Sequence, residues 1–364
     1  MPILKYSQKN ELSDIAIWKQ IKMDFGSIIR REIDDDGIYL EEQCINNKIS
    51  DKYPVLPSSP ILSLATIHLF VKECINNEIT KFPIQKNQNP PEISHIKDLN
   101  YFSNIFLNLW LNYPTDLFPS AEILLAKKVF LKPQYYYQEL TNEHKISISN
   151  PEKNQADIVN DFIDEIKNSI KQPEFKRNQR KQISAARKNF DGASEYINRL
   201  LLIHSSLKIV RLECGIPDQD DFKKTGDIAK IFLKKFTNNR RNNGLFHEML
   251  GGLWKLEAYP DRGAYFHFMV FFHANTQLNS DEIARQIGNY WVHRITNSKG
   301  SYRLCSKSNN PYISSSIGIV KSNDKQSCLD LCHALYYLTF KDRYLKIGDF
   351  ENGRRFGKWK LTEI

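Results

Sequence analysis

Two groups of residues in this sequence have the types and spacing that metal binding or catalysis requires. The first group lies within Leu250–Phe272. Two runs of alternating side chains flank a Pro-Asp-Arg-Gly segment there, a pattern typical of a β-hairpin. Because successive side chains of a strand point to opposite faces, Glu257 and His267 are expected on the same, less apolar face. A carboxylate beside an imidazole can bind a divalent metal ion, so the sequence predicts a metal site at these two residues.

The second group lies on a predicted helix, Lys325–Tyr344, one side of which carries the polar residues Asp330, His333, Tyr337, Lys341 and Tyr344. Tyr337 and Lys341 are separated by about one helical turn, only about 40° around the axis. A lysine ammonium beside a phenol favours the phenolate, and it could equally neutralise the charge of a phosphoryl transition state. Tyr337 is therefore a candidate nucleophile for attack on a phosphodiester. The alternative is a tyrosine that packs at the edge of a core and keeps its hydroxyl in water.

The elements that would position these groups follow residue 205 in the order strand, helix, strand, strand, helix, strand, helix. They are a strand at Leu207–Glu213, a helix at Asp227–Phe236, the hairpin, a helix at Ser280–Arg294 capped by Ser280, a strand at Ser316–Val320 and the helix Lys325–Tyr344. This order predicts an α+β fold with a ferredoxin-like antiparallel sheet that carries helices on one face only.

The hairpin is expected to turn its aromatic face toward those helices. The predicted core residues on this face are Trp254, Leu256, Ala258, Phe266, Phe268, Val270 and Phe272. Glu257 and His267 would lie on the open face of the sheet. Tyr265 and Phe271 on that open face would also suit stacking on RNA bases, which gives a broader alternative function.

The charge of the chain favours a polyanionic partner. The net charge is +9 and the isoelectric point is about 9.0, values shared by nucleic-acid-binding proteins and by many others. The segment between Lys171 and Lys188 is rich in Lys and Arg and contains a single acid, Glu174. It is interpreted either as a surface that follows DNA phosphates, with Phe175 and Phe190 as stacking or anchoring groups, or as a solvated helix face between two domains. The candidate phosphate contacts are Lys176, Arg177, Arg180, Lys181 and Arg187, with Arg240 and Arg241 in a second basic cluster.

A chain of 364 residues is long enough for two domains. We expect a mainly helical N-terminal region at residues 1–155, with the clearest helical periodicity at Leu62–Cys74 and Tyr101–Leu111. A basic helical linker at residues 156–195 would begin with an amphipathic helix at Asp157–Ile170, and the sheet domain would occupy residues 196–364. The sequence shows neither a signal peptide nor an apolar run long enough to cross a membrane, and its six cysteines fit buried free thiols. A cytoplasmic protein is expected.

Five segments, taken together with their order and spacing, resemble one known family. They are SLKIVRLECG, LGGLWKLEAYPDRGAYFHFMVFF, IARQIGNYWVHRIT with KGSYRLC after it, SIGIV and YLTFKDRYL. Residues from about 160 to 360 are thereby similar to the filamentous-phage (inovirus) gene-two-type replication initiators and to the prophage YagK/YfjJ C-terminal domain family. The resemblance implies a His-hydrophobe-His endonuclease that uses Mg²⁺ or Mn²⁺ to nick single-stranded or supercoiled DNA at an origin. A tyrosine would stay linked to the 5′ end while the 3′ end primes rolling-circle synthesis, and host replication proteins would be candidate partners.

Residue by residue, the resemblance places His267 at the second histidine of the metal pair and Tyr337 at the nucleophilic tyrosine, with Tyr344 as the closing aromatic of that segment. Glu257 would add a carboxylate ligand from the neighbouring strand. The sequence departs from the family in two places: Tyr265 stands where the first histidine is expected, and Lys341 stands one residue later than the family's lysine. A neutral phenol is a poor ligand for Mg²⁺ or Mn²⁺. The favoured hypothesis is an active enzyme that nicks and joins single-stranded DNA, and the alternative is a DNA-binding accessory or regulatory protein that has lost the metal chemistry.

Overall fold

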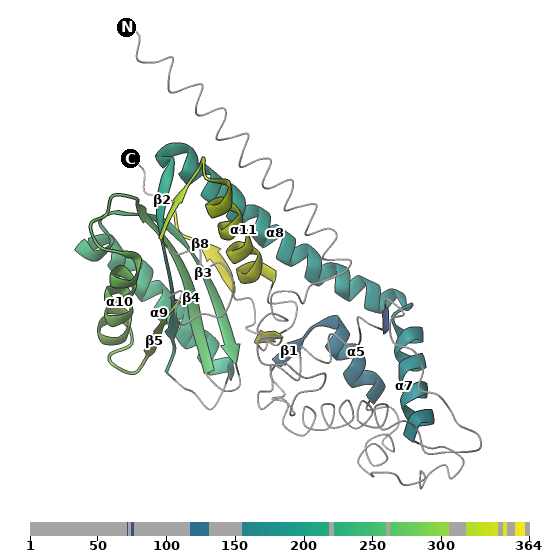
Figure 1. Cartoon of the computed structure of the whole chain (residues 1–364). Coiled ribbons are helices and arrows are strands. Elements are labelled where there is room, and N and C mark those ends of the chain that lie inside the picture. Colours follow the sequence, from purple (N-terminus) through teal and green to yellow (C-terminus); the bar gives the residue numbers. More distant parts are fainter. Residues whose placement is uncertain are drawn as a thin grey trace, which may run out of the picture. The chain divides into compact units, whose positions relative to one another are not determined.

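The computed structural model describes residues 71, 74, 75, 117–130, 155–217, 222–259, 263–305, 318–340, 345–347 and 354–360 (Figure 1). The chain divides into two compact units, here called the helical unit and the sheet unit, and the division falls within helix α8 between residues 185 and 186. This division lies inside the segment 156–195 that the sequence predicts as a linker.

The helical unit contains β1 (Leu117–Pro119), α5 (Ala121–Phe130), α7 (Gln155–Ser169) and the first turns of α8 (Pro173–His204), and β1 pairs with β7 (Leu345–Ile347). Helix α7 confirms the amphipathic helix expected at Asp157–Ile170. The predicted helices Leu62–Cys74 and Tyr101–Leu111 lie almost wholly outside the described residues, although residues 71 and 74 are helical. The mainly helical character expected before the sheet is therefore confirmed for the described residues.

Side-chain hydrogen bonds hold the start of α8 against the start of α5. Gln179 donates to a carboxylate oxygen of Glu122 at 2.8 Å, and the Gln182 side chain accepts from the backbone N–H of Ala121 at 3.0 Å. Glu122 is buried, so the amide of Gln179 supplies a partner to a carboxylate that water reaches poorly. These contacts fix which side of α8 faces inward over its first turns.

The sheet unit is built on a six-stranded antiparallel sheet. Its strands are β2 (Ser206–Gly215), β3 (Met249–Tyr259), β4 (Gly263–His273), β5 (Ser301–Leu304), β6 (Gly318–Lys321) and β8 (Phe356–Lys358). The order is β5-β2-β4-β3-β8, and β6 pairs with the other half of β2 along the edge that β5 also uses. The predicted antiparallel sheet, the strand at Leu207–Glu213 and the hairpin are confirmed.

Two helices, α9 (Phe222–Asn239) and α10 (Ser280–Tyr290), cover the aromatic face of the hairpin. Phe236 of α9 stacks on Phe268 of β4 with ring centroids 5.0 Å apart. The core predicted from the alternating pattern is confirmed for Trp254, Leu256, Phe266, Phe268, Val270 and Phe272, which are all buried. The side chain of Ala258 lies outside the described part of the structure.

The opposite face of the sheet is also covered, by the C-terminal half of α8 and by α11 (Lys325–Phe340), as Figure 1 shows. The prediction of an open face is therefore wrong. Met269 and Phe271 are 0% exposed on this face and Tyr265 is 4% exposed, so none of them is available for base stacking. The reason is the hydrophobic effect: the strand carries apolar side chains on both faces, and helices that cover both faces bury them and stabilise the folded state.

The two phenylalanines of the basic segment belong to the interior. Phe175 is 9% exposed and Phe190 is 4% exposed, and Phe190 packs edge to face on Tyr336 and Phe340 of α11. Both side chains pack in the interior and hold α8 in place, so neither ring is accessible for stacking on nucleic-acid bases.

The ends of the remaining helices differ from prediction in detail. Asn279, and not Ser280, caps α10: its side chain accepts from the Glu282 N–H at 2.9 Å, while the Glu282 carboxylate accepts from the Asn279 N–H at 3.0 Å. The predicted last turn is a π-helix, Trp291–Ile295, and two 3₁₀ turns, Arg240–Asn242 and Gly244–Phe246, lead from α9 to β3. None of the helices in the described ranges is long and apolar enough to cross a membrane.

Candidate functional site

The strand register brings the polar residues of the hairpin together on the face covered by α8 and α11. Lys255 of β3 pairs with His267 of β4, and Glu257 pairs with Tyr265. Beyond β4, Glu213 of β2 pairs with the same His267. Residues directly opposite each other on neighbouring strands share a face of the sheet. The group formed in this way is called the polar cluster and consists of Arg211, Glu213, Lys255, Glu257, Tyr265 and His267.

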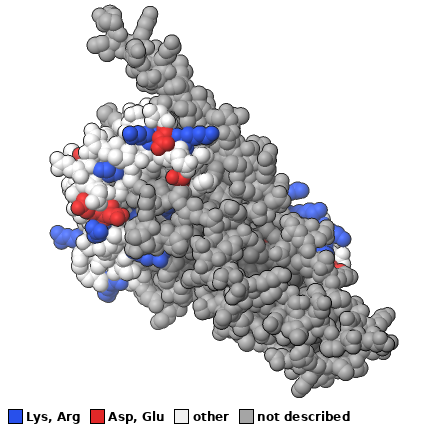
Figure 2. All heavy atoms as spheres, in the orientation of Figure 1, with Lys and Arg blue, Asp and Glu red and all other residues white. Residues whose placement is uncertain are grey.

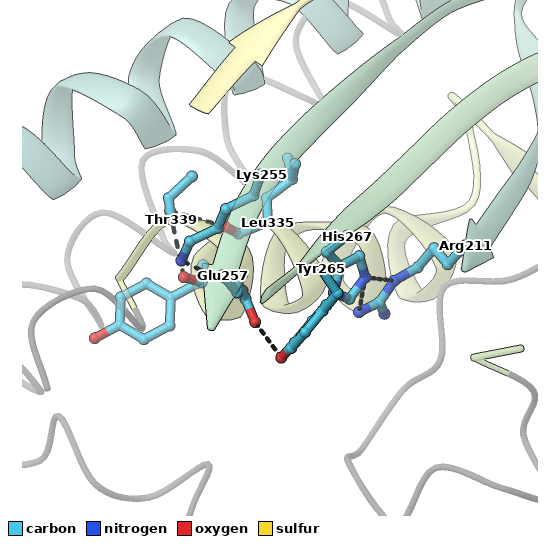
Figure 3. Close-up of polar contacts among 8 residues, drawn as sticks. Arg211, Lys255, Glu257, Tyr265, His267, Leu335 and Thr339 are labelled. Atoms are coloured by element: carbon cyan, nitrogen blue, oxygen red, sulfur yellow. Dashed lines mark hydrogen bonds and ion pairs between the residues drawn. The ribbon is translucent and has the colours of Figure 1, made fainter. Parts of the chain in front are cut away.

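Glu257 lies at one end of the polar cluster, where a phenol and an ammonium approach its carboxylate (Figure 3). The Tyr265 hydroxyl donates to Oε2 of Glu257 at 2.7 Å, and Nζ of Lys255 lies 3.6 Å from Oε1. The Glu257 side chain is 5% exposed and that of Lys255 is 1% exposed, so solvent screens this ion pair weakly. The carboxylate is therefore neutralised by a charge from the protein itself.

His267 lies at the other end, beside a guanidinium (Figure 3). Nε and Nη2 of Arg211 lie 3.4 and 3.3 Å from Nε2 of the imidazole. Because a guanidinium can only donate, Nε2 must be the accepting nitrogen of a neutral ring with its proton on Nδ1. Burial, and next the charge of Arg211, lower the pKa of His267 to about 4, against the opposite effect of Glu257 and Glu213. The imidazole is therefore neutral at physiological pH.

The donor set of the polar cluster does not suit the Mg²⁺ or Mn²⁺ that the family resemblance implies. Both ions prefer several oxygen ligands, and a nearby fixed positive charge opposes their binding. One Glu257 oxygen accepts from Tyr265, the other faces the Lys255 ammonium, and the accepting nitrogen of His267 faces Arg211. The positions from which a metal would draw its ligands are turned toward cations of the protein.

The candidate nucleophile belongs to α11, which lies beside this cluster. Leu335 and Thr339 of α11 lie next to Lys255 in Figure 3, and the Thr339 hydroxyl donates to the Leu335 carbonyl at 2.8 Å. The backbone of Tyr337 is helical, but its side chain lies outside the described part, as do Lys341 and Tyr344 entirely. Their catalytic roles remain predictions.

The candidate phosphate contacts of α8 all lie at the surface. The residues Lys176, Arg177, Arg180, Lys181, Arg187 and Lys188 are exposed, whereas Phe175, Ala186 and Phe190 on the same helix are buried. At about 100° per residue, the exposed set occupies an arc of about 140°, and its centre is about 140° from that of the buried set. Figure 2 shows basic side chains gathered over the first turns of α8. This surface is called the basic stripe.

In the second predicted basic cluster, Arg240 and Arg241, the described side chain of Arg240 contacts other residues of the protein. Arg240 packs over the ring of Trp359, 4.9 Å from its centroid, and donates to Sδ of Met249 at 3.3 Å. These contacts favour a structural role for Arg240 over contact with phosphate. The side chain of Arg241 lies outside the described part of the structure.

Arg211 and Lys255 are the site residues whose role sequence reasoning missed. Each lies two residues before a glutamate on its own strand, as in Arg211-x-Glu213 and Lys255-x-Glu257, which places cation and carboxylate on one face. Both strands are otherwise rich in apolar side chains, and a charge buried among them needs a counter-charge. This pattern was the available signal, but only the register reveals which imidazole and carboxylate each cation meets.

No family model, curated protein sequence or solved structure matches this chain. The functional argument therefore depends on the geometry of the polar cluster, the basic stripe and the family resemblance of the sequence segments.

Proposed function

We propose that this protein is a cytoplasmic DNA-binding protein related to the inovirus replication initiators, which acts on DNA as an accessory or regulatory factor and not as a metal-dependent nickase. The observation that carries the proposal is the basic stripe of α8. Its exposed Lys and Arg side chains lie on the side of the helix opposite the buried residues, so they take no part in core packing and are accessible to a partner.

The dimensions of the basic stripe fit a nucleic-acid backbone. From Lys176 to Lys188 the helix rises about 18 Å, at about 1.5 Å per residue. Double-stranded DNA carries one phosphate charge per about 1.7 Å of axis, and a single strand carries fewer, so several phosphates fall within that span. The net charge of +9 adds a long-range attraction for the same partner.

The order of the strands supports a relationship to the proposed family at the level of fold. We propose a ferredoxin-like core made of β2, α9, β3, β4, α10 and β5. The spatial order β5-β2-β4-β3 and the helical connections through α9 and α10, both on one face, support this topology. Strands β6 and β8, with helices α8 and α11, would then be additions around that core.

The polar cluster favours the non-catalytic alternative over the nickase. A nickase of the proposed family needs a metal ion that touches both the protein and a DNA phosphate. Here the imidazole of His267 and the carboxylate of Glu257 are 2% and 5% exposed and face Arg211 and Lys255. A phosphate could reach them only after several buried groups moved apart.

The binding proposal is tested by the salt dependence of DNA affinity. We expect anisotropy titrations with a labelled single-stranded oligonucleotide to give an affinity that falls with salt. In Arg180→Gln/Lys181→Gln, the slope of log K against log salt should decrease by about 1.4, because each lost phosphate contact removes about 0.7. The control Lys321→Gln/Lys325→Gln removes two exposed lysines elsewhere and should leave the slope unchanged. Equal effects of both double variants would refute the basic stripe as the binding surface.

The nickase alternative is tested on the same protein. Supercoiled DNA that carries the flanking region of the gene is incubated with Mn²⁺, and denaturing gels reveal any covalent protein–DNA adduct. We expect DNA binding without an adduct or a nicked product. An adduct that disappears in Tyr337→Phe would establish the nickase and exclude the accessory role proposed above.

A further inference from the structure

The polar cluster pairs its buried charged groups within the protein. The carboxylate of Glu257 faces Lys255, the neutral imidazole of His267 faces Arg211, and Glu213 at the edge of the cluster pairs with Arg303, with Oε2 and Nε 2.8 Å apart. Burying an ion is costly unless an opposite charge or hydrogen bonds accompany it. A nearby cation therefore stabilises a buried carboxylate, and that cation can be a bound metal ion or a side chain of the protein.

Lys255 is positioned as that cation. Its ammonium lies 3.6 Å from Oε1 of Glu257, and its residue pairs directly with His267 across the sheet. Glu257 and His267 are diagonal neighbours on these two strands, and Lys255 neighbours both, because it lies opposite His267 and two residues before Glu257. At 1% exposure, the ammonium cannot exchange its partner for water without opening the fold.

We infer that the Lys255 ammonium at Glu257 and the Arg211 guanidinium at His267 together take the place of a divalent metal ion in this cluster. The chain's own lysine would supply the charge that an ion supplies elsewhere, and the polar cluster would assemble without metal. The inference concerns the interior of the sheet unit alone, so it can fail while DNA binding by α8 stands, and the reverse also holds.

The experiment removes the lysine and adds a ligand. In Lys255→Met/Tyr265→His, the ammonium is absent and a second imidazole joins Glu257 and His267. The matched control, Lys255→Arg/Tyr265→His, adds the same imidazole but keeps a cation at residue 255. Thermal unfolding of the full chain is compared in EDTA and in Mn²⁺, with the loss of the free Mn²⁺ spin-resonance signal as a measure of stoichiometry.

We expect the methionine variant to bind one Mn²⁺ and to gain roughly 5 °C or more in its midpoint at Mn²⁺ concentrations a hundred times Kd. The wild type and the arginine control should show neither effect. If the methionine variant unfolds in EDTA, recovery of its folded fraction on addition of Mn²⁺ becomes the readout. Stoichiometric Mn²⁺ binding by the wild type, an equal response of the arginine control, or no response of the methionine variant would each overturn the inference.

Discussion

Replacement of Glu257 by glutamine tests whether the polar cluster is held together by buried charge. The glutamine amide keeps the shape of the side chain and can still accept the Tyr265 hydroxyl, but the Lys255 ammonium loses this counter-charge. Removing one partner of a buried ion pair typically costs about 3–5 kcal/mol. We expect the lower end, about 3 kcal/mol, because the 3.6 Å separation is longer than a charge-assisted hydrogen bond. This corresponds to a fall of about 6–12 °C in the unfolding midpoint.

The matched control is Asp227→Asn, which removes a carboxylate from an exposed pair. Asp227 and Lys230 lie 3.1 Å apart, with side chains 71% and 47% exposed. Exposed pairs of this kind contribute about 0.5 kcal/mol or less, so the midpoint should barely move. Urea unfolding followed by tryptophan fluorescence includes a signal from the sheet unit, because three of the five tryptophans, Trp254, Trp291 and Trp359, are buried in its core.

A second substitution separates lost charge from lost packing. When Lys255→Met is added to Glu257→Gln, the unpaired ammonium disappears, and we expect at least half of the lost stability to return. If Glu257→Gln unfolds at the same urea concentration as Asp227→Asn, the reasoning from buried charge is refuted. A double variant that is less stable than either single variant would refute it equally.

Three further outcomes follow from the structure. The pKa of His267 is lowered from 6.5 to about 4, so between these pH values the unfolded chain binds a proton that the folded chain does not bind. The resulting contribution to the free energy of unfolding should be fully present above pH 6.5 and should fall by about 3 kcal/mol as the pH drops to 4. Urea titrations of His267→Gln should lack this pH-dependent loss of stability. Gly288→Ala would place a methyl group 2.2 Å from the ring of Tyr302, and we expect overpacking to cost about 1–3 kcal/mol in the same urea assay, whereas Gly244→Ala, with open space around it, should cost much less. Asn279→Ala removes the cap of α10 and should cost about 1 kcal/mol, measured against Gln277→Ala at an exposed position outside the helix.

Local patterns in the sequence predicted much of the sheet unit. The alternation of Phe266, Phe268, Val270 and Phe272 identified one face of β4, because the two-residue period of a strand is a local property. The start of α10 was predicted to within one residue, since the capping box Asn279-x-x-Glu282 is a local signal, although Ser280 was predicted as the cap. These features depend on neighbours within a few positions of the chain.

The second covered face required information that local patterns do not contain. Met269 and Phe271 are apolar on the side predicted to be open, but only the packing of α8 and α11 explains why they are 0% exposed. The roles of Arg211 and Lys255 likewise depend on register: a shift of one residue between β3 and β4 would turn Lys255 away from His267. Long-range pairing of this kind is not encoded in the spacing of either segment alone.

We expect charge at the surface to control DNA binding and charge in the interior to control stability, and this separation would distinguish the two candidate functions. Neutralising exposed residues of α8 should weaken DNA binding and its salt dependence while stability stays within about 0.5 kcal/mol of the wild type. Neutralising Lys255 or Glu257 should lower stability while the salt slope of DNA binding stays the same, because these side chains are 1% and 5% exposed. A nickase would break this separation, since its buried ligands would hold a metal ion that also contacts a DNA phosphate. Cluster variants that remain folded but lose affinity for DNA would therefore favour the nickase.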